Sequence, residues 1–341
     1  MNPNVCPICK ESRELIPIMK YNEFFMYQCK DCKVQFFWGA KNPGAHWYEE
    51  TSDYEIKNVI GPKIYRGSHK KFLQKYLQFP AGTAVLELGC GSGEFIAELE
   101  KRGYTVFGVD FDRKGIELAK KYFGLKNVFA EPFEGFFKRQ NLPLFDYVVF
   151  FEVIEHVQDP LKFIKSAKKL LKPGGKMIIS TPSRERMLAN WNNWDFPPHH
   201  LTRWNKEAIS NLFSKINFEI SDFCYVEQFK MIMGAIDGRF RSGLAARTAS
   251  NSIENKKSSL LAKVLYILAK IKMYLIGFVP AFFLWTFGRL TGRNNGIMFV
   301  ELQINRDTNI PACRQAGKCI LMQPIIRMCL FAKECRIRTI N

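Results

Sequence analysis

Three glycines in five positions follow the apolar run that opens "VLELGCGSGEF", residues 85–95. They are Gly89, Gly91 and Gly93. The pattern predicts a strand that turns sharply into a helix from about Glu94, and such a turn lets a nucleotide-like ligand approach the backbone. The dinucleotide pattern G-x-G-x-x-G would need glycine in place of Glu94, whose carboxylate would repel a pyrophosphate. A ligand without phosphates, such as S-adenosylmethionine, fits better, and a nearby acid can then be useful. Glu87 and the three glycines are therefore candidates for the cofactor site.

A second acid stands at the spacing expected for a ribose contact. The segment "YTVFGVDFD", residues 104–112, predicts a strand ending at Asp110, about 20 positions after Gly89. In nucleotide-binding α/β units an acid at this distance accepts hydrogen bonds from ribose hydroxyls. Asp110 is therefore the candidate for that contact. In the alternative interpretation, the glycines form an ordinary loop and Asp110 only ends a strand.

Polar residues end the next apolar run, "FDYVVFFEVIEHVQDP", residues 145–160. The run predicts a central strand buried on both faces. Phe151 and Glu152, at its end, are further candidates for the cofactor site. A helix beginning there would put Glu152 and His156 on one face, with Glu155 offset.

His156 is the leading candidate for a catalytic base. The methyl group of a sulfonium is already activated, so transfer to a hydroxyl needs alignment and a group that takes the proton. An imidazole titrates near neutrality, and His156 follows the C-terminal end of a strand, where doubly wound folds bind ligands. In the alternative, Glu155 and His156 only cap and pack a helix.

His199 and His200, in "FPPHHLTRW", are the other possible catalytic bases. Pro197 and Pro198 stiffen the approach to them. Three tryptophans stand close in sequence and would suit a ring-shaped acceptor such as a sugar or a quinol precursor. They are Trp191, Trp194 and Trp204.

Strands and helices alternate through residues 83–183 and should position these groups. The segment 161–183 predicts an amphipathic helix stopped by Pro173-Gly174-Gly175 and then a strand over Met177 to Ser180. Alternation of this kind favours a parallel, doubly wound sheet in an α/β fold.

These motifs resemble the core of the class I S-adenosylmethionine-dependent methyltransferases. The resemblance rests on "ELGCGSG", on "VD" at 109 and 110, on "FDYVVFFEVIEHV" and on "LKPGGKMIIST". Residues 196–220 are similar to the subset with ubiquinone-biosynthesis-type and sugar methyltransferases. The resemblance implies S-adenosylmethionine as cofactor and a Rossmann-like, mostly parallel seven-stranded sheet with an antiparallel edge. Phe218 to Val226 and Gly296 to Ile304 are the candidates for that edge.

Four cysteines near the N-terminus have the spacing C-x2-C-x19-C-x2-C. They are Cys6, Cys9, Cys29 and Cys32. The spacing predicts a structural zinc ribbon over residues 1–40, with a core separate from that of the sheet. Disulfides are the alternative, but no signal peptide is visible, so we expect a cytoplasmic protein with reduced thiols.

Residues 41–80 are expected to form a linker and a helix before a methyltransferase core over 81–229. The helical pattern places Phe72, Leu73, Tyr76 and Leu77 on one face. By analogy with the family, this helix would cover the cofactor. Four polar residues then either line the cleft or lie on the surface: Tyr54, Tyr65, Arg66 and His69.

The positive charge is concentrated toward the C-terminus. The 341 residues carry a net charge of +18, and residues 230–304 hold 11 Lys and Arg against 3 Asp and Glu. Within a predicted helical insertion, 230–293, Lys256, Lys263 and Lys270 recur every seven residues beside an apolar run too short to span a membrane. Residues 258–290 are therefore predicted to contact a membrane peripherally; packing on the sheet or in a dimer interface is the alternative. Residues 294–304 would form the last strand, and 305–341 an irregular tail.

The favoured function is methyl transfer, most simply O-methylation, to a small-molecule, sugar or lipid-linked glycan acceptor at the inner membrane face. An RNA methyltransferase is one alternative, because zinc ribbons precede some such cores, although the basic excess lies away from the predicted cleft. A noncatalytic adenosylmethionine-fold protein is the other.

Overall fold

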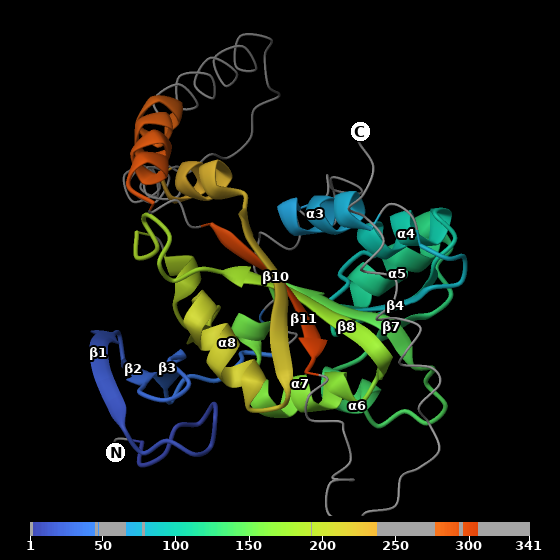
Figure 1. Ribbon diagram of the computed structural model, residues 1–341, viewed down its shortest axis with the longest axis horizontal. Coiled ribbons are helices and arrows are strands. Elements are labelled where there is room, and N and C mark those ends of the chain that lie inside the picture. Colours follow the sequence, from blue (N-terminus) through green and yellow to red (C-terminus); the bar gives the residue numbers. More distant parts are fainter. Residues whose placement is uncertain are drawn as a thin grey trace, which may run out of the picture. The chain divides into compact units, whose positions relative to one another are not determined.

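The computed structural model describes residues 3–44, 47, 66–76, 79–191, 193–236, 277–292 and 296–305 (Figure 1). Lys256, Lys263 and Lys270, together with residues 306–341 of the predicted tail, lie outside the described residues. The division of the chain at residues 40, 80 and 229 stays a prediction.

A seven-stranded sheet forms the centre of the fold, as the sequence predicts. Its strand order is β10-β11-β8-β7-β4-β5-β6. The strands are β4 (Ala84–Leu88), β5 (Thr105–Asp110), β6 (Val128–Ala130), β7 (Phe145–Phe151), β8 (Leu171–Pro182), β10 (Phe218–Val226) and β11 (Ile297–Ile304). β11 pairs antiparallel with both β8 and β10, whereas the other pairs are parallel. The chain leaves β4 toward β5 and later returns to its other side with β7, so the topological switch point lies between β4 and β7.

One predicted boundary is wrong. The helix after β7, α7 (Pro160–Lys168), ends before the Pro-Gly-Gly segment. That segment instead lies inside β8, where the register with β7 shifts between the pairs Phe145↔Leu171 and Tyr147↔Lys176. The extra residues are accommodated as an irregularity in the strand, because glycine and proline are tolerated at bulges.

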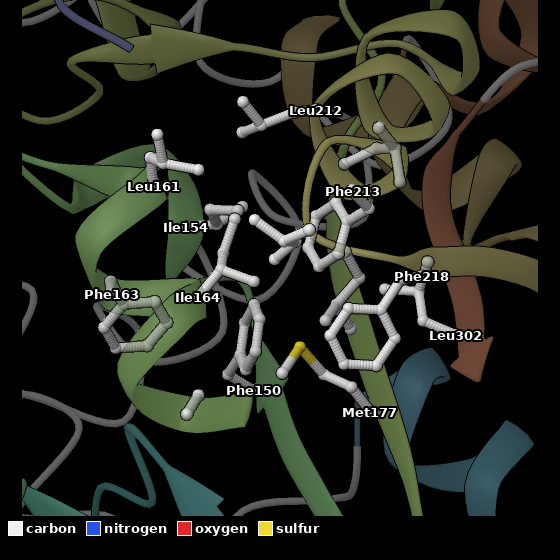
Figure 2. Close-up of a cluster of buried hydrophobic side chains, with 14 of the residues drawn as sticks. Phe150, Ile154, Leu161, Phe163, Ile164, Met177, Leu212, Phe213, Phe218 and Leu302 are labelled. Carbon is white, nitrogen blue, oxygen red and sulfur yellow. The ribbon is translucent and has the colours of Figure 1, made fainter. Parts of the chain in front are cut away.

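Helices cover both faces of the sheet (Figure 1). On one side lie α3 (Gly67–Lys75), α4 (Glu94–Lys101) and α5 (Arg113–Phe123), and on the other lie α6 (Phe133–Phe136), α7 and α8 (Lys206–Ser214). Asp159 caps α7 by accepting from Lys162 N, and Asn205 caps α8 by accepting from Ala208 N. Figure 2 shows the core beneath α7 and α8, where Phe150, Ile164 and Met177 are buried.

The N-terminal residues form a second, four-stranded sheet of order β1-β2-β3-β9. Its strands are β1 (Leu15–Tyr21), β2 (Phe24–Cys29), β3 (Gln35–Trp38) and β9 (Thr202–Arg203). The cysteines, Val34 and Phe36 belong to the same buried cluster as Ile164 and Phe213 of α7 and α8. The expectation of a separate ribbon core is therefore wrong, because the ribbon packs directly on the helices that cover the main sheet.

Candidate active site

The glycine turn connects β4 to α4, and each of its glycines has a positive φ angle. The angles are 83° at Gly89, 53° at Gly91 and 78° at Gly93, a region that disfavours other residues. A Cβ added at Gly93 would lie 2.8 Å from Leu125 Cδ1, and one at Gly89 would lie 2.5 Å from a Val153 methyl carbon. Nothing lies within 4 Å of a Cβ added at Gly91. The turn therefore packs tightly at both ends and faces open space in the middle.

Asp110 ends β5 beside this turn and is 7% exposed. Its carboxylate accepts backbone hydrogen bonds from Gly91 N at 2.8 Å and from Asp112 N at 2.9 Å. Burial raises the pKa of Asp110 to about 6, although the two backbone bonds act in the opposite direction. Each carboxylate oxygen can accept a further hydrogen bond. The turn thus holds an acceptor in place for a ligand hydroxyl.

The helix α3 brings two basic side chains to acids at the ends of β4 and β7. His69 Nε2 lies 3.5 Å from Glu87 Oε1, and Arg66 Nη1 lies 3.3 Å from Glu152 Oε2. The sequence did not determine whether Arg66 and His69 line the cleft or lie on the surface. In the structure, each lies beside an acid of the predicted cofactor site. Tyr54 and Tyr65 lie outside the described residues.

Three carboxylate oxygens around the turn are buried without a hydrogen-bond partner among the described residues. They are Glu87 Oε2, Asp112 Oδ1 and Glu152 Oε1. Burial of a carboxylate without partners is unfavourable, so these oxygens suit a ligand that carries donors or positive charge. S-adenosylmethionine carries an ammonium, a sulfonium and two ribose hydroxyls. With the open space at Gly91, the residues present fit this cofactor.

Glu152 does not lie on a helix, which corrects the expectation that it shares a helical face with His156. It has a φ of 56°, and its N–H donates to Ser180 O on β8 at 2.8 Å, so the sheet pairing continues past the end of β7. Only a short 3-10 turn, η1 (Ile154–His156), follows. His156 therefore reaches its place through a turn.

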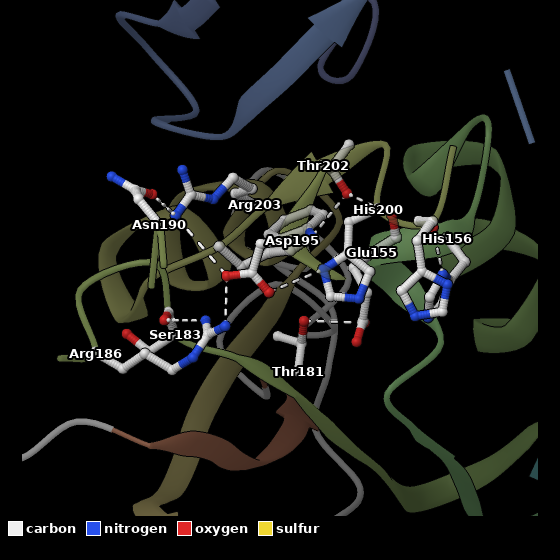
Figure 3. Close-up of polar contacts among 12 residues, drawn as sticks. Glu155, His156, Thr181, Ser183, Arg186, Asn190, Asp195, His200, Thr202 and Arg203 are labelled. Carbon is white, nitrogen blue, oxygen red and sulfur yellow. Dashed lines mark hydrogen bonds and ion pairs between the residues drawn. The ribbon is translucent and has the colours of Figure 1, made fainter. Parts of the chain in front are cut away.

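The structure brings the three predicted histidines together, and Figure 3 labels two of them, His156 and His200. Ring nitrogens of His156, His199 and His200 lie within 4.8 Å of one another. His156 Nδ1–H donates to His199 O at 2.6 Å, which leaves Nε2 as the acceptor of the neutral ring. Burial and the two neighbouring imidazoles lower the pKa of His156 well below its usual value. A neutral ring can take a proton. Three imidazoles at this spacing could also hold a divalent metal ion.

Asp195, which follows from no motif in the sequence, orients His200. Its Oδ1 lies 3.4 Å from His200 Nδ1, and the same carboxylate pairs with Arg186 and lies 3.9 Å from Arg203 Nη2. Burial alone would raise the pKa of Asp195, but the His200 hydrogen bond and the Arg186 charge outweigh it and lower the pKa to about 2. Asp195 is therefore an anion, and its contact with His200 Nδ1 fixes the orientation of the imidazole ring.

A cavity of about 10 Å³ adjoins this group, lined by Glu155, Pro182, Arg184, Arg186, Asp195, His200, Thr202 and Arg203. It has room for about one water molecule. Glu155 is 1% exposed and accepts a hydrogen bond from Thr181 Oγ1 at 2.9 Å. Burial raises the pKa of Glu155 to about 8. The cavity is too small for an acceptor, which must approach the imidazoles from outside it.

The ribbon and the residues just after it support the two arms of the histidine cluster. Phe36 of β3 pairs with Thr202 of β9, two residues after His200, and Phe37 N donates to Leu201 O at 3.1 Å. On the other arm, Asn42 Nδ2 donates to His156 O at 2.8 Å. The backbone around the cluster is therefore held by residues far away in the sequence.

The tryptophans near the histidines have different environments. Trp194 is 49% exposed, and its ring stands edge-on to His199 with centroids 5.0 Å apart. Trp191 is also exposed. Trp204, in contrast, is fully buried and donates from Nε1 to Thr202 Oγ1 at 2.9 Å, so it supports the core and cannot face an acceptor.

The four N-terminal cysteines converge as their spacing predicts. The Sγ atoms are 3.9 Å apart for Cys6 and Cys32 and 3.8 Å apart for Cys9 and Cys29, too far for disulfides. A tetrahedral zinc ion with Zn–S bonds of about 2.3 Å would separate its sulfurs by roughly 3.8 Å. Ile8 N donates to Cys6 Sγ and Cys32 N to Cys29 Sγ, both at 3.4 Å. The four thiolates could therefore hold a structural zinc ion.

Comparison with known proteins decides the family. A model described as a methyltransferase domain matches residues 63–222. A ubiquinone biosynthesis O-methyltransferase of Coxiella burnetii (strain Dugway 5J108-111) is 30% identical over 181 residues, which are 52% of this chain and 70% of that protein. The chain belongs to the S-adenosylmethionine-dependent methyltransferases. The enzyme of the same description from Actinobacillus pleuropneumoniae serotype 5b (strain L20) is 30% identical over 41% of this chain, and the match spans only 61% of its own length.

A solved structure shares the fold of this methyltransferase. The [4+2]-cyclase SpnF has a TM-score of 0.50 and 14% identity, over 78% of this chain and 99% of that one. Because that protein is described as a cyclase, the architecture alone does not determine the reaction.

The predicted cofactor residues of the methyltransferase meet at the C-terminal ends of β4, β5 and β7. Glu87, the glycines, Asp110 and Glu152 lie around the turn, as described above. Phe151 is 3% exposed and packs against Phe95 and His69, so it shapes the site from beneath. The binding role of each residue stays a prediction.

Cofactor affinity is expected to fall at low pH through Asp110. Ribose hydroxyls bind a carboxylate better than a carboxylic acid, and the Asp110 pKa is about 6, so S-adenosylhomocysteine should bind about tenfold more weakly at pH 5 than at pH 7.5. The same raised pKa means that the folded ligand-free protein binds this proton more tightly than the unfolded chain. Its stability contribution therefore rises as the pH falls from about 6 toward 4.

Calorimetric titration of wild type and Asp110→Asn at both pH values checks this. The variant should bind ten- to a hundredfold more weakly at pH 7.5 and lose most of the pH dependence. Equal pH dependence in both proteins would assign the titration to another group.

Proposed function

We propose that this methyltransferase transfers the methyl group of S-adenosylmethionine to a hydroxyl of a small-molecule acceptor. The observation that supports this most is the histidine cluster. His156 is neutral, directs its Nδ1–H to His199 O and keeps the Nε2 lone pair for a proton. It follows β7 by a few residues, on the same edge of the sheet as Glu152 and the glycine turn.

The bound cofactor supplies a methyl group already activated on sulfur. The residues of the chain then have two tasks, alignment of the acceptor oxygen and removal of its proton. His156 takes the proton, and His200, oriented by Asp195, borders the position of the acceptor oxygen. The exposed ring of Trp194 beside His199 offers a face for a ring-shaped acceptor. Relatives described as ubiquinone biosynthesis O-methyltransferases support a ring hydroxyl as the methylated group.

We extend the proposal to acceptors presented at the inner membrane face, such as a lipid-linked glycan. The basic C-terminal third and the exposed apolar residues of 277–290 support this. Among the residues that the structure describes, no helix combines the length and apolar character needed to cross a bilayer, so contact would be peripheral. No described contact favours RNA over these acceptors.

Removal of the base should abolish turnover and leave cofactor binding intact. His156→Asn keeps a donor that can reach His199 O but lacks the Nε2 lone pair, so we expect methyl transfer to fall at least about a hundredfold. Transfer of labelled methyl groups to catechol and to envelope lipid extracts measures turnover, and titration with S-adenosylhomocysteine measures binding.

Leu144→Ala, which removes an exposed side chain at the opposite end of β7, is the control and should retain most of the activity. Near-normal transfer by His156→Asn would remove His156 from the proton transfer. If chelation abolishes methyl transfer by wild type and leaves cofactor binding unchanged, activation of the acceptor hydroxyl would be assigned to a metal ion held by the histidines.

A further inference from the structure

Within the part of the chain that the structure describes, the helical residues 277–290 pack on one side against a small apolar cluster. Ala281 is fully buried against Ile232 and Ile236 of the helical residues 228–236, and Leu284 and Trp285 are partly buried in the same cluster. Figure 1 shows the two helical segments side by side, in orange and ochre. This inner side attaches the segment firmly to the fold.

The opposite side is apolar and open to solvent. Four residues make up this apolar face: Val279, Phe282, Phe283 and Phe287. Their exposed fractions run from 46% for Phe282 to 68% for Phe283. Steps of four residues from 279 to 287, with Phe282 beside them, place them on one helix surface. Single exposed apolar residues are common, but a contiguous aromatic patch marks an interaction surface.

We propose that the apolar face inserts into the headgroup region of a lipid bilayer that contains anionic lipids. Positive charge belongs to the same part of the chain. Arg289 lies on the same helical segment, with its guanidinium over the Trp285 ring, 5.0 Å from the centroid. In the sequence, residues 237–276, which connect the two helical segments, hold 8 Lys and Arg against 2 Asp and Glu. An apolar helix surface in a cation-rich part of the chain is the composition of an interfacial segment.

The size of the apolar face favours a bilayer over a second copy of the chain. At 1.5 Å per residue, residues 277–290 extend about 21 Å, and a strip about 10 Å wide covers on the order of 200 Å². A stable protein interface needs about 800 Å² from each partner. A bilayer has no such minimum, because each inserted aromatic ring contributes separately.

The apolar face connects to the predicted acceptor site through packing. Met187 and Leu188 pack in the same cluster as the two helical segments, and they directly follow Arg186, which pairs with Asp195. A bilayer bound at the apolar face would therefore lie near the loop that orients His200. This link to an acceptor rests on the proposed function, whereas binding to the bilayer does not.

Flotation of the full chain with vesicles tests the proposal. Wild type should float with vesicles of phosphatidylcholine and phosphatidylglycerol, and less with phosphatidylcholine alone. The double variant Phe283→Glu/Phe287→Glu should reduce the floated fraction at least about tenfold. Tyr122→Glu/Leu144→Glu changes two equally exposed apolar residues elsewhere and should float like wild type. Titration with S-adenosylhomocysteine confirms that each variant is folded.

Equal flotation of wild type and of Phe283→Glu/Phe287→Glu would overturn the proposal, as would no flotation of wild type. A wild-type dimer that becomes a monomer in the double variant, measured by light scattering without vesicles, would assign the face to a second copy instead. Methyl transfer to catechol without vesicles separates the two proposals. Transfer without flotation would overturn only the proposal that the apolar face binds a bilayer. Flotation without transfer to any acceptor would overturn only the proposed function.

Discussion

Cys29→Ser is expected to destabilise the catalytic sheet as well as the ribbon. A four-cysteine zinc site contributes folding free energy directly, on the order of 10 kcal/mol in small zinc domains. In this chain the cysteines are buried in one cluster with residues of α7 and α8. Loss of a ligand should therefore loosen packing beyond the ribbon and lower the free energy of unfolding by at least about 3 kcal/mol.

Elemental analysis and denaturant unfolding followed by tryptophan fluorescence check this expectation. Wild type should carry one zinc ion per chain and the variant much less. Cys224→Ser, at a half-buried cysteine of β10, is the control and should change neither quantity appreciably. If wild type purified without chelator contains no metal, the zinc assignment is wrong. Equal unfolding midpoints of wild type and Cys29→Ser would show that loss of the zinc ligand does not destabilise the core that the ribbon shares with α7 and α8.

The glycine turn should respond differently at two neighbouring positions. Gly93 has a φ of 78°, and its added Cβ would lie 2.8 Å from Leu125 Cδ1 and 2.9 Å from Ala119 Cβ. Gly93→Ala should therefore cost about 2–4 kcal/mol of stability through backbone strain and overpacking. Gly91→Ala has the strain without the clash and should cost about 1 kcal/mol.

The variant that loses less stability, Gly91→Ala, should lose more cofactor affinity. The methyl of Gly91→Ala would project into the open space over the turn, so S-adenosylhomocysteine should bind at least tenfold more weakly to a protein that is still folded. Thermal unfolding and calorimetric titration of both variants measure this. Normal affinity of Gly91→Ala would place the cofactor away from the turn.

Most of the fold follows from local patterns. Apolar runs and their end signals predicted β5 and β7. The resemblance to the methyltransferase family implied the two edge strands, and the bounds of β10 agree with the candidate residues. The prediction was wrong where tertiary packing overrides a local signal. Pro173-Gly174-Gly175 reads as a helix stop, but pairing with β7 draws this segment into β8. Glu152 reads as a helix start, yet its bond to Ser180 O continues the sheet.

The site was predictable as a set of residue types and only partly as a geometry. The three histidines were identified from residue chemistry and from their positions after predicted strands, but their convergence depends on the loop that pairs β9 with the ribbon. Asp195 is not part of a recognisable sequence motif, and its role follows only from its contacts with Arg186 and His200 in the structure. Arg66 and His69 lay on a predicted helix, but which acids they would meet depends on the packing of α3 on the sheet.

The contact between the ribbon and α8 sets an order of events during synthesis. Asn211 Nδ2 donates to Asp31 O across 180 positions of the chain. At 5–20 residues per second, the ribbon would be made roughly 10–35 s before its docking partner. During that interval the helices that later bury the four cysteines have not yet been made. We therefore expect a ribbon that binds zinc to take up the ion first and to dock afterwards, so that zinc supply during translation would determine how much enzyme matures.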